Sequence, residues 1–247
     1  MYDRPETAAA NDRFWSGLNA PLCYGPDALS RGLADYWPVW QSPELLFSQT
    51  CGMPYRTRLH GAVQLIGTPD YGLDGCPPGH YRSVFVARAA ETGQPLEAFH
   101  GRRMAYNEAL SQSGWAAPVN HMLPLGIRPG SLVQSGGHAL SARAVARGKA
   151  DFAALDALTW ELLKTYDGFA AELAVIAVTE PTPALPFITA PGRDADALAD
   201  AVEAAISNLE PSDREILHLK GLVRIPAASY LAVATPPSPE ELAASAA

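Results

Sequence analysis

The chain has 247 residues, of which 48% are hydrophobic and 18% are charged, and its formal net charge is −8. This composition is that of a globular protein long enough to bury one or two cores. The negative charge disfavours a nucleic acid or an anionic membrane as partner. No apolar run reaches the roughly 18 residues that a membrane-spanning helix needs.

Apolar periodicity and the positions of Pro and Gly predict most elements of the chain. Those expected in the first half are a helix from Pro5, a helix over 27–35, and strands over 44–50, 63–67, 81–87 and 101–106. Those expected in the second half are a helix from Ser113, a strand over 132–134, a helix over 138–147, a strand over 151–155, a helix over 158–165, strands over 173–178 and 187–189, and helices over 196–209 and 213–219. The alternation of strands and helices predicts an α/β fold with largely parallel sheets. The tail after Thr235 is expected to be frayed.

In open α/β sheets, ligands bind at the carboxyl ends of the strands. The loops expected at those ends are 50–52, 68–71, 107–114, 135–138 and the residue Asp156. These loops are rich in hydroxyl and amide donors and in glycine, and they contain no lysine or arginine. A small ligand bound there would meet neutral hydrogen-bond donors.

The segment Ser111-Gln112-Ser113-Gly114 is the most informative of these loops. Ser113 can cap a helix whose free N–H groups and positive dipole end would face an anion, and Gly114 permits close approach of the backbone. The competing interpretation is an ordinary serine cap. His138 could donate to an oxyanion as a neutral ring, or it could be structural. Asp156 could contact the ligand, or it could cap the helix that follows.

Catalysis and metal binding have little support in the sequence. Ser113, His138 and Asp156 occur in the order of a hydrolytic triad, but no G-x-S-x-G elbow is present. The six histidines show no metal-ligand spacing such as H-E-x-x-H, and the three cysteines are too scattered for a zinc site. We therefore expect no catalytic residue, no metal and no cofactor.

Four stretches together resemble a known family: YRSVFVAR, GRRMAYNEALSQSG, SGGHALSARAVARGKADFAALDALTWELL and EPTPALPFITA. Their order is similar to that of the phosphate, phosphite and phosphonate-binding components of ABC importers. The resemblance implies a type 2 periplasmic-binding-protein fold, in which two α/β lobes are joined by two crossing strands around a ligand cleft. One lobe would comprise 1–84 plus 186–247 and the other 85–185. The implied ligand-binding residues are Thr68, Tyr71, Ser111, Ser113, Gly114, His138 and Asp156.

The same resemblance implies a monomeric solute-binding protein that closes over a small oxyanion and delivers it to an ABC transporter permease. Where relatives bind amino-phosphonates, an acidic residue precedes the crossing proline, but this chain has Leu185 before Pro186. An ammonium-bearing ligand is therefore not expected. The alternatives are a ligand sensor, or a cytoplasmic enzyme resembling the thiamine-pyrimidine synthases. Such an enzyme needs a lysine, and Lys149, Lys164 and Lys220 all lie outside the expected ligand loops.

Compartment and thiol state are linked expectations. The family is normally periplasmic, yet the sequence shows no basic region followed by an apolar run at its start, which leaves a cytoplasmic location open. Cys51 and Cys76 follow consecutive predicted strands, whose spacing of about 4.8 Å would allow a disulfide, although two separate thiols are the alternative. Cys23 has no such partner.

Overall fold

The computed structural model describes residues 2–22, 24–32 and 35–245, and the chain divides into two compact units. Unit 1 comprises 1–80 and 183–232, and unit 2 comprises 81–182 and 233–247. The chain thus passes between the units after His80, after Thr182 and again after Ala232. The resemblance implied only two passages and placed both ends of the chain in one lobe. In the structure, residues 233–245 belong with unit 2.

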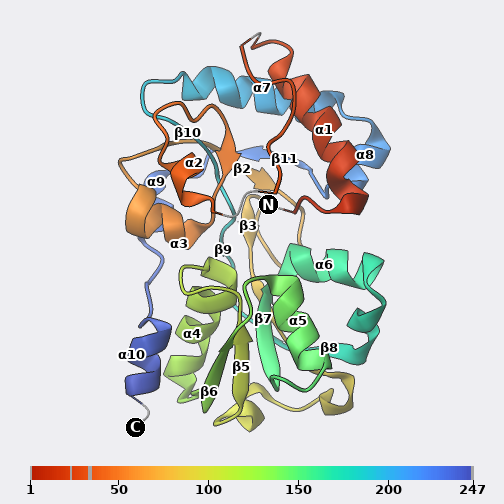
Figure 1. Cartoon of the computed structure of the whole chain (residues 1–247), viewed down its shortest axis with the longest axis vertical. Coiled ribbons are helices and arrows are strands. Elements are labelled where there is room, and N and C mark those ends of the chain that lie inside the picture. The colour runs from red at the N-terminus through yellow and green to blue at the C-terminus, as the bar shows by residue number, and fades with distance from the viewer. Residues whose placement is uncertain (1, 23, 33–34, 246–247) are drawn as a thin grey trace. The chain divides into compact units, whose positions relative to one another are not determined.

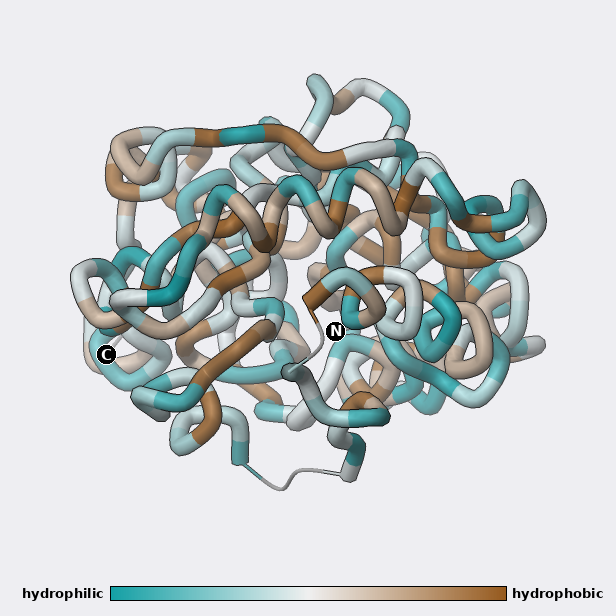
Figure 2. The backbone as a smooth tube through the Cα atoms, turned by 90° about the horizontal axis from the view of Figure 1, so that it is seen from above, coloured by the Kyte–Doolittle hydropathy of each residue, from teal (hydrophilic) through white to brown (hydrophobic). Residues whose placement is uncertain are grey.

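Unit 1 is a four-stranded sheet with helices. Its elements are α1 (Pro5–Asn19), α2 (Trp37–Trp40), β1 (Ser48–Gln49), α3 (Gly52–Pro54), a π-helical turn η1 (Tyr55–Leu59), β2 (Gln64–Asp70), β10 (Phe187–Thr189), α7 (Ala195–Asn208), α8 (Pro211–Ile216), β11 (Gly221–Val223) and α9 (Ala227–Leu231). The strand order is β1-β10-β2-β11, and each neighbouring pair is antiparallel. Helices α1 and α7 pack together, and Phe14 of α1 stacks on Phe187. The tube in Figure 2 shows hydrophobic and hydrophilic stretches alternating along the helices, as one-sided burial requires.

Unit 2 is a five-stranded sheet flanked by helices (Figure 1). Its elements are β4 (Ser83–Arg88), η2 (Ala89–Glu91), η3 (Leu96–Phe99), β5 (Arg103–Tyr106), a π-helical turn η4 (Gln112–Ala116), α4 (Ala117–Met122), η5 (Leu123–Leu125), β6 (Ser131–Gln134), α5 (His138–Ala146), β7 (Phe152–Asp156), α6 (Ala157–Tyr166), η6 (Gly168–Glu172), β8 (Leu173–Val178) and α10 (Pro239–Ala244). The remaining strands, β3 (His80–Tyr81) and β9 (Thr182–Pro183), contain the first two passages and pair with each other.

The strand directions correct the expectation of largely parallel sheets. In unit 2 the order is β6-β5-β7-β4-β8, and only β5 is parallel to its neighbours, β6 and β7. β4, which lies between β7 and β8, runs antiparallel to both. Buried strands read as continuous apolar runs whichever way their neighbours point, so the sequence pattern did not reveal direction.

Two predicted elements differ from the structure. The helix expected over 27–35 is wrong over the described residues 27–32, which form no helix. Gly32 has φ 71°, and the Arg31 guanidinium is held by Asp3 at 2.6 Å and by Asp12 at 2.8 Å. The tail is also not frayed, because it contains α10, in which Ser238 and Glu241 form a reciprocal capping box.

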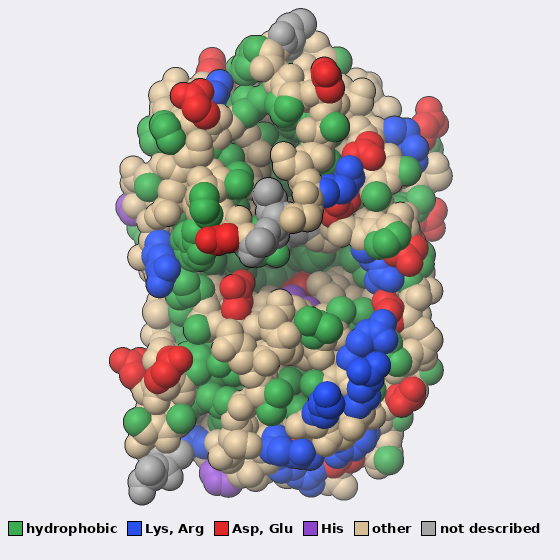
Figure 3. Space-filling model, viewed as in Figure 1, with side chains coloured by type: hydrophobic (Ala, Val, Ile, Leu, Met, Phe, Trp, Pro, Cys, Tyr) green, Lys and Arg blue, Asp and Glu red, His purple; other side chains and the backbone are tan. Residues whose placement is uncertain are grey.

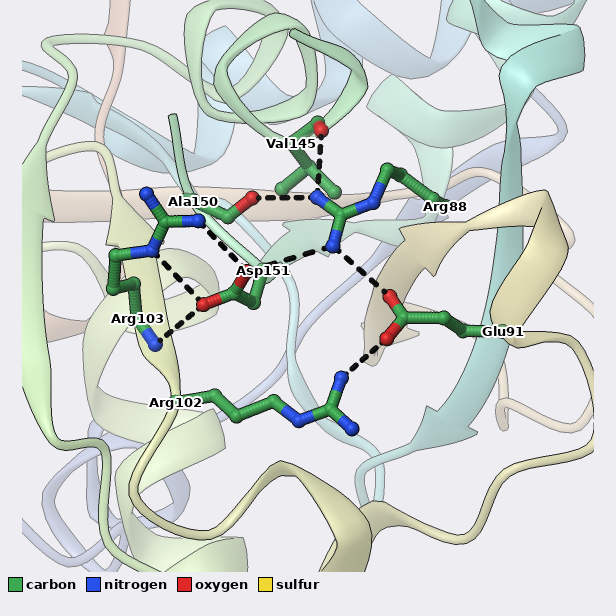
Figure 4. Close-up of polar contacts among 7 residues, drawn as sticks. All are labelled: Arg88, Glu91, Arg102, Arg103, Val145, Ala150 and Asp151. Atoms are coloured by element: carbon green, nitrogen blue, oxygen red, sulfur yellow. Dashed lines mark hydrogen bonds and ion pairs between the residues drawn. The ribbon is translucent and has the colours of Figure 1, made fainter. Parts of the chain in front are cut away.

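A network of ion pairs between side chains lies at the edge of unit 2 where β5 and β7 begin (Figure 4). Asp151 binds Arg103 at 2.9 Å and Arg88 at 3.4 Å, and Glu91 binds both Arg88 and Arg102. The hydrogen bonds from Arg103 are the largest cause that holds the pKa of Asp151 well below its usual range. Figure 3 shows Lys and Arg side chains gathered on the surface of unit 2, with acidic side chains beside some of them. Most of this network's charge is therefore compensated locally.

Cys51 and Cys76 are both thiols and are not joined as a disulfide, while Cys23 lies outside the described residues. No group of histidine, cysteine or acidic side chains in the described part of the chain has the arrangement of a metal site. Within the same residues, no helix combines the length and the apolar character needed to cross a bilayer.

Candidate functional site

The candidate site lies in unit 2, where three parallel strands end at one edge of the sheet. β5, β6 and β7 lead into η4, α5 and α6 respectively. The loops are held to each other, since Ser135 N–H donates to the Tyr106 carbonyl at 2.8 Å and Gly136 N–H donates to the Asn107 carbonyl at 3.0 Å. Predicted residues that are separated by more than forty positions in the sequence are thereby gathered at one edge.

The first helical turn after β5 is built by serines. Ser111, and not Ser113 as predicted, is the cap: its Oγ accepts from Gly114 N–H at 2.9 Å. That bond leaves the hydroxyl hydrogen of Ser111 for another acceptor. The turn is wide, with Ala116 N–H donating to the Ser111 carbonyl five residues earlier, and the hydroxyl of Ser83 on β4 donates to the Ser113 carbonyl at 2.8 Å. Ser113 does not cap the helix, and its hydroxyl lies within hydrogen-bond distance of His138.

Gly114 is sandwiched between two side chains of the site. A Cβ at this position would lie 1.9 Å from Asn107 Oδ1 and 3.1 Å from His138 Cε1. The backbone φ is not what demands glycine here, because the constraint is one of space. Asn107 Oδ1 is buried and has no hydrogen-bond partner among the described residues, which is unusual for a buried polar atom.

His138 joins the first turn of η4 to the end of β7. Its Nε2 lies 3.0 Å from Ser113 Oγ and 3.5 Å from Asp156 Oδ2. The predicted proximity of Ser113 and His138 is confirmed by the first of these distances. Nδ1 of His138 is buried, with no hydrogen-bond partner in the described part of the structure.

Burial is the main influence on the charge of His138. Desolvation lowers the pKa of the ring, and the Asp156 carboxylate and the Ala154 carbonyl oppose that shift. The net direction is downward, so the ring is neutral near pH 7. A neutral imidazole donates from one nitrogen and accepts at the other.

Asp156 is the cap of α6. Its Oδ1 accepts from Thr159 N–H at 2.8 Å, and its Oδ2 accepts from the Thr159 hydroxyl. Asp156 can cap α6 and also contact a ligand, since the two roles are compatible. The structure shows the cap, and the ligand contact stays a prediction. Ser113 and Asp156 both approach Nε2 of His138, whereas a hydrolytic relay places the acid on the opposite ring nitrogen. This arrangement does not form the triad that the residue order suggested.

The two site residues predicted in unit 1 are engaged with that unit's own core. Thr68 Oγ1 lies 2.5 Å from the Tyr230 hydroxyl, which donates to the Ala184 carbonyl at 3.0 Å. Burial is the largest cause that raises the pKa of Tyr230. Tyr71 accepts from Gln49 Nε2 at 2.9 Å. Both predicted residues are buried within unit 1, and their role in ligand binding stays a prediction.

The comparison with protein families decides the relationship. A model of the periplasmic substrate-binding proteins of phosphonate ABC transporters matches residues 47–230, about three quarters of the chain. The chain belongs to this family. A search of curated proteins gave no match.

Solved structures show the same fold at low sequence identity. PhnD1 from Prochlorococcus marinus, in complex with methylphosphonate, is 16% identical, with 90% of each chain covered and a TM-score of 0.70. A binding-protein component of a phosphonate ABC transporter from Pseudomonas aeruginosa is 14% identical, with 87% of this chain and 75% of that chain covered and a TM-score of 0.66. A Xanthomonas citri protein bound to ATP is 17% identical, with 97% and 92% covered and a TM-score of 0.63. The fold is the type 2 periplasmic-binding-protein fold, as the sequence analysis expected.

Sequence reasoning did not single out three residues that lie in, or contact, the expected ligand loops. Asn107 and Ser83 were not predicted as site residues, although Asn107 lies in a loop that the analysis had selected. Lys220, expected outside the ligand loops, has its side-chain methylenes against Gly72, since a Cβ on Gly72 would lie 3.0 Å from Lys220 Cγ. Gly72 follows Tyr71 directly. No sequence signal pairs residues 72 and 220, because the contact depends on the pairing of β11 with β2.

Proposed function

We propose that this substrate-binding protein captures a small oxyanion, such as phosphate, phosphite or a phosphonate, by closure of its two units, and delivers it as a monomer to the permease of an ABC importer. The observation that carries the proposal is the convergence of Ser111, Ser113 and His138 at one sheet edge. Family membership supports the solute-binding role and a periplasmic setting. The anion is inferred from the donors.

The chemistry of these donors suits an oxygen-rich anion. The Ser111 hydroxyl has a hydrogen to give, and Gly114 keeps side-chain bulk away from the backbone N–H groups at the start of the helix. Because His138 is neutral, the ligand-free site does not bear the cost of burying a charged ring beside the buried Asp156 carboxylate. Buried neutral donors recognise an anion by hydrogen-bond geometry rather than by net charge.

The side group of the ligand is expected to be uncharged or absent. Leu185 is 4% exposed and occupies the position before the crossing proline, where an ammonium group would need an acid. We therefore expect an amino-phosphonate to bind no better than the alkyl phosphonate of the same size. This expectation concerns specificity and does not affect the oxyanion site itself.

A thermal-shift panel tests the proposal. Phosphate, phosphite, methylphosphonate and sulfate are added to the protein, and at about 100 times Kd a true ligand adds about 2.7 kcal/mol to the free energy of unfolding. The variant S113A/H138A should fold but lose this stabilisation. The control S207A removes a hydroxyl from α7 that bonds only along its own helix, to the Glu203 carbonyl, and should keep it. Absence of any oxyanion effect on the wild type, or its retention in S113A/H138A, contradicts the proposal.

A further inference from the structure

The C-terminal segment of unit 2 is bonded to the helix that begins at the candidate site. The indole Nε1 of Trp115 donates to the Pro237 carbonyl at 3.0 Å, and Asn120 Nδ2 donates to the Ala234 carbonyl at 2.8 Å. Trp115 is fully buried and directly follows Gly114. One segment, residues 233–245, thus contacts both η4 and α4. We call it the C-terminal brace.

The helix that the brace contacts is weak by itself. It begins with a wide π-helical turn, and Pro118 then removes a backbone donor close to the start of the six-residue α4. Helices this short owe their stability to packing rather than to propensity. Without outside support, the turn that carries Ser111, Ser113 and Gly114 would sample other conformations.

The brace is itself firmly attached. Leu242 of α10 is 4% exposed, and α10 packs against β6. Figure 1 shows α10 on the same side of unit 2 as α4. Arg128 donates to the Ser245 hydroxyl at 2.9 Å. Burial raises the pKa of Tyr106, and the nearby negative charge of Glu240 raises it further. The centre of the Tyr106 ring lies 5.0 Å from that of the Trp115 ring. Tyr106 ends β5, immediately before Asn107.

From these contacts we infer that the C-terminal brace is a positioning element of the ligand site: it fixes the η4–α4 helix and thereby sets oxyanion affinity. The inference rests on the proposed function for its ligand. None of the hydrogen bonds of the brace described above involves a predicted ligand-binding residue. The inference therefore predicts that loosening α10 weakens oxyanion binding indirectly, through the η4–α4 helix.

Two neighbouring positions of α10 provide a matched test. Leu242 is buried and Ala243 is exposed, so L242D detaches the brace, whereas A243D adds the same charge to the same helix without detaching it. In L242D we expect the backbone amides of 112–122 to exchange hydrogen faster than in A243D. The Kd for methylphosphonate should rise about 3- to 10-fold, the range expected for losing a supporting hydrogen bond. A chain that ends after Thr235 should behave like L242D.

The outcomes separate this inference from the proposed function. Equal exchange in L242D and A243D, or faster exchange with an unchanged Kd, overturns the positioning role. If the wild type binds neither methylphosphonate nor any other oxyanion of the panel, the proposed function fails. The exchange comparison, which needs no ligand, then decides whether the brace holds the helix.

Discussion

Gly114 has less room for a side chain than the neighbouring glycines of the candidate site, Gly136 and Gly137. The Asn107 and His138 side chains occupy the space that a Cβ would need, and the Gly114 N–H is held by Ser111. Gly137, which caps α5 at the neighbouring loop, is the opposite case. Its φ is −173°, an extended conformation open to any residue, and a Cβ there would meet nothing closer than 3.9 Å.

These two glycines give a matched pair of substitutions. G114A should lower the free energy of unfolding by about 1–3 kcal/mol, because the new methyl group must displace the Asn107 side chain, and it should weaken oxyanion binding. G137A should change both quantities little. Chemical denaturation and ligand titration of the two variants provide the comparison. Equal stability and equal affinity of G114A and G137A would show that the crowding has no energetic consequence.

His138 should make stability depend on pH. Burial lowers the pKa of this residue in the folded protein, while the unfolded chain has the ordinary value near 6.5. Below that pH the unfolded state binds a proton that the folded state does not, so the free energy of unfolding decreases as the pH falls. The slope attributable to His138 is at most about 1.4 kcal/mol per pH unit.

Urea unfolding between pH 7.5 and 5 measures this slope. H138N should flatten it, whereas H60N, which changes an exposed histidine, should leave it as in the wild type. A wild-type slope that survives in H138N would mean that other groups are responsible.

At the scale of elements, sequence patterns located most helices and strands but not their details. The strand 173–178 and the strand 187–189 are confirmed residue for residue, because each is a short apolar run bounded by turn residues. β11 and α9 were not predicted. The cap of η4 was assigned two residues late, because both Ser111 and Ser113 fit a cap and only the backbone geometry distinguishes them.

The caps of α6 and α7 separate a structural role from a ligand role. Asp156 accepts from Thr159 N–H at 2.8 Å, and Asp194 accepts from Ala197 N–H at 2.9 Å. D156A and D194A should therefore each cost about 1 kcal/mol of unfolding free energy. Only D156A should change oxyanion affinity, since only Asp156 lies beside His138. Parallel denaturation and binding measurements test this, and a similar change of affinity in D194A would assign the effect to general destabilisation.

At the scale of the whole molecule, the resemblance predicted the family and the fold, and the structure supplied the connections. The resemblance implied a lobe over 85–185, and the first segment of unit 2 comprises residues 81–182. The third passage of the chain, after Ala232, was not expected, because a polar, proline-rich stretch reads as a loose tail. Its attachment depends on Trp115 and Asn120, which are more than a hundred positions away, and no local pattern reveals such contacts.

Closure predicts a change of dimensions in solution. An oxyanion that stabilises the protein in the thermal-shift panel should also reduce the radius of gyration measured by small-angle X-ray scattering, since hinge closure brings the two units together. S113A/H138A, measured at the same ligand concentration, should keep the radius of the ligand-free protein. A stabilising ligand that leaves the radius unchanged would support binding without closure.

The interleaving of the chain between the units also has a consequence for how the protein is made. Unit 1 lacks β10 and β11 until residues 187–223 have been synthesised, and unit 2 lacks its brace until residues 233–245 have followed. The sheet of unit 1 cannot be completed from a contiguous stretch, whereas all five strands of the unit 2 sheet lie within residues 83–178. The contacts that complete unit 1 therefore join distant segments and must overcome a larger loop-closure entropy. The five strands of unit 2 are therefore all synthesised before β10 and β11, so the sheet of unit 2 can form while unit 1 still lacks two of its four strands.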